Sequence, residues 1–80
     1  MSVAVIEQLN KDHITISLGP HYRAVTFKLA NGGAECVVLD NNATETTRFA
    51  IAPPRPGYVL EVNFVDGGVE IIYREVKGST

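Results

Sequence analysis

The chain has 80 residues and a mass of 8.7 kDa, and its formal net charge is −2, from seven Lys and Arg against nine Asp and Glu. With 45% hydrophobic and 20% charged residues it has the composition of a folded globular protein, which excludes an intrinsically disordered chain. Its length leaves room for one domain, so we expect a single all-β domain over residues 1–80, with a frayed tail at residues 77–80.

Charge, cysteine content and the N-terminal sequence indicate the compartment and exclude several classes of partner. The basic residues are scattered singly, which argues against tight non-specific binding to nucleic acids. Cys36 is the only cysteine, so the chain cannot form the intramolecular disulfides that small secreted domains usually carry. The N-terminal segment has no basic region and reaches Glu7 after a short apolar run, unlike a signal peptide or a membrane span. We therefore expect a cytoplasmic protein with no membrane partner.

Apolar and polar residues alternate along most of the chain, and β-branched and aromatic residues are frequent between the turns. No long stretch shows helical spacing. Clusters of Gly, Pro, Asn and Asp separate the alternating segments. The sequence therefore predicts seven strands, which are, in chain order, Val3–Leu9, His13–Leu18, Tyr22–Leu29, Glu35–Asp40, Thr46–Ala52, Tyr58–Val65 and Val69–Val76.

Three short connections predict hairpins. They are Asn10–Asp12, Asn31–Gly33 and Asp66–Gly68, and the two glycine-containing ones suit the tight turns that match strand twist. The segment Pro53–Gly57 carries three prolines, which cannot donate ladder hydrogen bonds, so it should interrupt the sheet. We expect a small antiparallel barrel or a two-sheet sandwich of about six to seven short strands linked by hairpins.

Some segments are apolar on both strand faces, which predicts that both faces are covered by a second sheet, by barrel closure or by another copy of the chain. These segments are Val3–Ile6, Glu35–Leu39 and Val69–Tyr73. If one such face stayed exposed, Ile72, Val76 and Val59 would form an apolar patch of the kind found at interfaces. We expect a homodimer or larger assembly at micromolar concentration.

No motif indicates catalysis, a cofactor or a metal. His13 and His21 could approach each other with Glu7 across a hairpin, but they lack the spacing of metal ligands, and solvated loop histidines are the simpler interpretation. Cys36 has the acidic neighbour Glu35 and no nearby cation, so we expect a buried, functionally silent thiol. No serine stands in a Gly-x-Ser-x-Gly elbow. We expect no enzyme activity and no cofactor.

The proline-rich loop is the leading candidate for partner binding. Its expected contact residues are Pro54, Arg55, Pro56 and Tyr58. A rigid loop loses little entropy on binding, and arginine and tyrosine are enriched at interaction hot spots. If the loop is the hot spot, Arg55→Ala should weaken binding of a partner roughly thirtyfold with little change in melting temperature.

A second candidate surface consists of His21, Tyr22, Arg23 and Lys28, where an aromatic ring and cations could bind a nucleic-acid strand on a small β-barrel. A third interpretation is an oligomer that binds a small ligand or catalyses a reaction at a site shared between subunits. The favoured hypothesis is a small non-enzymatic interaction module, an accessory or regulatory protein that presents a rigid β surface to a protein partner and forms a homodimer.

Overall fold

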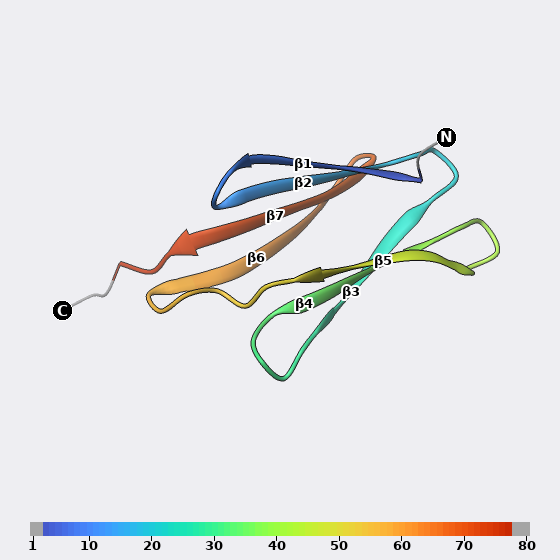
Figure 1. Ribbon diagram of the computed structural model, residues 1–80. Helices are drawn as coiled ribbons and strands as arrows, with labels where there is room; N and C mark the ends of the chain where they lie inside the picture. Colours follow the sequence, from blue (N-terminus) through green and yellow to red (C-terminus); the bar gives the residue numbers. More distant parts are fainter. Residues whose placement is uncertain (1–2, 78–80) are drawn as a thin grey trace.

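The computed structural model describes residues 3–77, which form seven strands in two antiparallel sheets (Figure 1). The strands are β1 (Ala4–Asn10), β2 (His13–Leu18), β3 (Arg23–Lys28), β4 (Ala34–Leu39), β5 (Glu45–Ile51), β6 (Tyr58–Val65) and β7 (Gly68–Glu75). The sheets have the strand orders β1-β2-β7-β6 and β3-β4-β5. The expected all-β class is confirmed, in the form of two sheets. Within residues 3–77 no helix is long and apolar enough to cross a membrane. Apart from Lys77, the tail expected at residues 77–80 lies outside the described residues.

All three predicted hairpins are present, as β1–β2, β3–β4 and β6–β7. The fifth strand also pairs with the fourth, so β4 lies in the middle of its sheet. The antiparallel pairing of β2 with β7, with Thr15 opposite Glu70, connects the N-terminal hairpin to the C-terminal one. The larger sheet is therefore built from the two ends of the described chain, and the smaller sheet from its middle.

The third strand is one residue shorter at each end than predicted, and the fourth begins and ends one residue earlier than predicted. Tyr22 lies outside β3 because its N–H donates to the carbonyl oxygen of Gly19 in a turn, at 3.1 Å. Asp40 lies outside β4, where its carboxylate accepts the N–H groups of Asn42 and Thr44, each at 2.9 Å. Local turn hydrogen bonds thus end these strands before the apolar alternation does.

The core lies between the two sheets. Its buried cluster consists of Ile16, Ala34, Cys36, Ile51, Val69 and Ile71. Cys36 is completely inaccessible, as expected, and burial raises the pKa of its thiol. The core side chains come from both sheets, so removing the apolar ones from water is what holds the two layers together.

The expectation that both strand faces are covered holds for β4 and is wrong for β1. In β4 the adjacent residues Val37 and Val38 are both buried, and Val37 lies between Val25 and Arg48 in the register of the sheet. In β1, by contrast, Val5 is 58% and Ile6 49% exposed. β1 is an edge strand, paired only with β2, and so lacks the neighbours that enclose a central strand.

Candidate interaction groove

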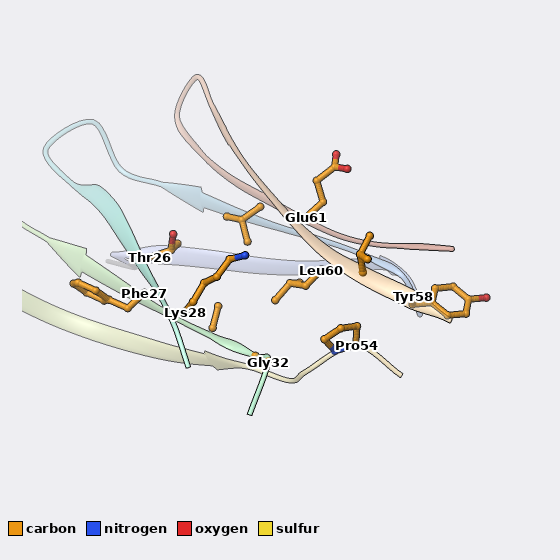
Figure 2. Close-up of a pocket in the computed structure, with 12 residues that line it drawn as sticks. Thr26, Phe27, Lys28, Gly32, Pro54, Tyr58, Leu60 and Glu61 are labelled. Carbon is orange, nitrogen blue, oxygen red and sulfur yellow. The ribbon is translucent and has the colours of Figure 1, made fainter. Parts of the chain in front are cut away.

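A groove of about 580 Å³ lies between β3 of the smaller sheet and β6 of the larger one (Figure 2). Both are edge strands, so each wall has unpaired backbone N–H and C=O groups. Residues 26–28 line it from β3 and residues 58–62 from β6, while Gly32, Gly33, Ala34 and Pro54 complete the wall. The groove therefore combines apolar side chains with backbone hydrogen-bonding groups, which is what an added β-strand requires.

Close backbone packing sets the position of the β3–β4 turn beside the groove. Gly33 donates its N–H to Oδ1 of Asn31 at 2.8 Å, and its carbonyl oxygen accepts the N–H of Leu29 at 3.0 Å. A Cβ at Gly33 would overlap the carbonyl oxygen of Ile51, so a side chain at this position would force the turn away from the end of β5. Glycine is thus required here for steric reasons.

The proline-rich loop is tied to the β1–β2 turn. Arg55 donates two hydrogen bonds to the carboxylate of Asp12, at 2.8 and 3.2 Å, and its guanidinium carbon lies 3.5 Å from the centre of the Tyr58 ring. The carbonyl oxygen of Arg55 also accepts the N–H of Tyr58 at 3.0 Å. These bonds lower the pKa of Asp12. Arg55, which was expected to contact a partner, is therefore already paired within the chain, although its side chain remains 40% exposed.

The two predicted surfaces are divided in a way that the sequence did not reveal. Pro54 and Tyr58 of the loop line the groove together with Lys28 from the alternative surface, whereas Arg55 and Pro56 do not line it (Figure 2). The remaining residues of the alternative surface, His21, Tyr22 and Arg23, line a smaller polar pocket of about 240 Å³ with Pro20, Asp40 and Asn41. The groove thus combines Pro54 and Tyr58, two of the four residues predicted in the loop, with Lys28 from the alternative surface.

The residues of the alternative surface do not form one continuous cationic surface. Arg23 and Lys28 stand at the two ends of β3, five residues apart, and strand alternation places them on opposite faces of the sheet. Arg23 shares its pocket with the carboxylate of Asp40. The two cations of the alternative surface are therefore divided between the two faces of β3.

The two histidines are also apart. His13 Nε2 lies 2.9 Å from Glu70 Oε2 on β7, whereas His21 Nδ1 lies 3.5 Å from Asn41 Nδ2 in the β4–β5 connection. Within residues 3–77, no three His, Cys, Asp or Glu side chains gather as metal ligands would.

The sequence did not predict that exposed apolar side chains gather on the sheet edges. Among residues 3–77, seven large hydrophobic side chains within strands are exposed, and all seven lie on the edge strands β1, β3 and β6. They are Val5, Ile6, Leu9, Phe27, Val59, Phe64 and Val65. Of the patch expected at Ile72, Val76 and Val59, the two valines are exposed and Ile72 is half-buried. The alternation of apolar and polar residues does not indicate which strands will lie at the edges of a sheet.

A second opening lies on the other side of the sandwich, between the edge strands β1 and β5. It is a mainly apolar cleft of about 250 Å³, with Ile6 on one side and Phe49 and Ile51 on the other. The two sheets therefore leave apolar side chains accessible along both of their open sides.

Ion pairs lie on the surface of both sheets, and one of them involves Glu61, which lines the groove. Glu61 accepts hydrogen bonds from Arg74 at 2.9 and 3.1 Å and from Asn63 at 3.1 Å, and these bonds lower its pKa to about 2. On the smaller sheet, Arg48 bridges Glu35 and Glu45. Lys28, by contrast, has no ion pair or side-chain hydrogen bond with any described residue, so the groove has one cation available to a partner.

Comparisons of the chain with protein-family models, with curated proteins and with solved structures found no match.

Proposed function

We propose that the protein is a small non-enzymatic interaction module, an accessory or regulatory protein that presents rigid β edges to a macromolecular partner and to a second copy of itself. The observation that carries the proposal is that all seven exposed large hydrophobics within the described strands lie on edge strands. Soluble proteins usually protect such edges with charges, prolines or covering loops, because unpaired edges template association with another chain. Edges that stay apolar are typical of an interface.

The groove between β3 and β6 supports the same proposal. Its walls come from two strands and from a loop held by the pairing of Arg55 with Asp12, so its shape is set before a partner arrives. Preorganisation of this kind reduces the entropy lost on binding. The polar side chains that line it are not hydrogen-bonded to one another as a nucleophile and its base would be, which favours binding over catalysis. We place the module in the cytoplasm, in keeping with a single cysteine, Cys36, that forms no disulfide within the chain.

Self-association is the first test. Light scattering or sedimentation across about a hundredfold range of concentration should show the mass rising from 8.7 kDa toward twice that value at micromolar protein. A reducing agent should not change this result, because Cys36 is buried and cannot link two copies. A monomer mass throughout the range would contradict the proposal.

A further inference from the structure

β6 has the features of an interface strand on both of its faces. It runs for eight residues, Tyr58–Val65, and is hydrogen-bonded to β7 on one side only. Val59, Phe64 and Val65 are 45%, 60% and 50% exposed. The strand contains neither proline nor lysine, the residues that commonly protect a sheet edge.

The order of side chains along β6 is self-complementary in an antiparallel pair. Leu60 and Val62 pack against the core, so alternation places Phe64 on the same face and puts Val59, Glu61, Asn63 and Val65 on the other. A two-fold axis through Val62 sets residues of like character opposite each other. The resulting pairs are Val59 with Val65, Leu60 with Phe64, Glu61 with Asn63, and Val62 with Val62 of the second copy.

When the two-fold axis passes through another residue of β6 near Val62, the residues that face each other no longer have like character, or they carry like charges. An axis through Glu61 sets the two Glu61 carboxylates directly opposite each other, which destabilises a sheet. An axis through Asn63 sets Leu60 opposite Asp66 and Glu61 opposite Val65. Shifting the pairing register of the two β6 strands by a single residue would set side chains from opposite faces of the two sheets beside each other.

We propose that β6 pairs antiparallel with β6 of a second copy about Val62, so that two four-stranded sheets join into one eight-stranded sheet. The inference rests on the proposed function and specifies its partner and its surface.

The groove beside β6 is completed by the second copy. Leu60 lines the groove (Figure 2). Phe64 of the second copy stands opposite Leu60 in the proposed register and therefore adds its ring to that wall. The groove gathers Lys28 with residues 58–62 of β6, whereas Arg23 and Ala24 share another pocket with Phe64 and Val65. Lys28 thus lies toward the Tyr58 end of β6. Continued one residue past the end of β6, the same register sets Asp66 of the second copy, in the β6–β7 turn, opposite Tyr58, which brings a carboxylate toward the free cation of the groove.

β1 does not offer an equivalent match. An axis through Ile6 sets Val5 opposite Glu7, and an axis through Glu7 sets two carboxylates opposite each other. Because β1 is also an edge strand with exposed valine and isoleucine, it provides the control surface for the experiment.

The test compares Val65→Lys with Val5→Lys. Both valines are at least half exposed and lie on edge strands of the same sheet, so neither change should unfold the monomer, which circular dichroism and thermal melting verify. We expect Val65→Lys to raise the dissociation constant of the dimer at least about tenfold, because each copy then sets an ammonium opposite Val59 of the other. Val5→Lys should leave the constant unchanged.

A double variant tests the register. Val59→Glu alone should also weaken the dimer, but combined with Val65→Lys it sets a carboxylate opposite an ammonium twice across the two-fold axis. The dimer should return and become sensitive to salt. Within one copy the two positions are six residues apart on one strand, roughly 20 Å, so contact inside the monomer cannot explain a rescue.

The outcomes separate the two proposals. A wild-type protein that stays monomeric contradicts the proposed function and the pairing together. A wild-type dimer that tolerates Val65→Lys, that dissociates with Val5→Lys, or that is not restored by the double variant overturns the β6 pairing and leaves the interaction module standing.

Discussion

Gly68 shows how a single residue sets the distance between two strands. It stands opposite Ser17 in the pairing of β2 with β7, and a Cβ at this position would overlap the carbonyl oxygen of Ile16. We expect Gly68→Ala to lower the free energy of unfolding by about 1–3 kcal/mol, as overpacking does, because backbone atoms must move to admit the methyl group. Urea denaturation measures the change.

Ser17→Ala is the matched control for this prediction. Ser17 is the register partner of Gly68, and the Ser17 side chain is exposed. The free energy of unfolding of Ser17→Ala should therefore stay within about 0.5 kcal/mol of the wild-type value. Equal stability of Gly68→Ala and the wild-type protein would show that the two strands can separate at little cost.

At the scale of elements, the proline-rich loop is held to the β1–β2 turn by one arginine. Arg55 keeps the pKa of Asp12 below its ordinary value of 3.8, chiefly through the hydrogen bonds between them. In Arg55→Ala the fold should persist, because the side chain lies at the surface, but the pKa of Asp12 should rise toward 3.8. Titration of the Asp12 carboxyl group followed by NMR checks this result.

Arg48→Ala is the control for the loop, since Arg48 pairs with Glu35 and Glu45 on the other sheet. Arg48→Ala should leave the pKa of Asp12 at its wild-type value. If Arg55→Ala also leaves it unchanged, the ion pair does not form in solution. Any effect of Arg55→Ala on partner binding then reports direct contact rather than the positioning of the loop beside the groove.

Over the whole molecule, we expect surface ion pairs to make stability depend on acidity. Among residues 3–77, three carboxyl groups have lowered pKa values, each through hydrogen bonds to an arginine, in the pairs Asp12–Arg55, Glu45–Arg48 and Glu61–Arg74. The unfolded chain therefore binds protons at a higher pH than the folded chain, and acid favours unfolding. The stabilisation from Glu61 is complete above about pH 4.5 and is lost as the pH falls toward about 2.

The expected result is a melting temperature that falls steadily between pH 4.5 and 2, the interval set by the ordinary and lowered pKa of Glu61. Glu61→Gln should flatten this profile, because the variant has no carboxyl group to protonate at that position. Thermal unfolding followed by circular dichroism at constant ionic strength measures both proteins. A wild-type profile that is flat over this interval would contradict the prediction.

Local patterns explain why the strands and hairpins could be predicted from the sequence. The alternation of Ile14, Ile16 and Leu18, or of Val69 and Ile71, specifies a strand and its inward face without reference to the rest of the chain. Short turns containing glycine and asparagine specify which consecutive strands pair. Of the candidate site, Pro54 and Tyr58 could be found in this way because they belong to a distinctive local segment.

The tertiary structure alone decided which strands are central and which are edges. β2 pairs with β7 across more than fifty residues, and Arg55 meets Asp12 across 43. Periodicity specifies the face that a residue presents but not the strand that lies beside it, because any two strands of like pattern can pair. For that reason the exposure of Val5 and the meeting of Lys28 with Tyr58 in one groove appear only when the two sheets are assembled.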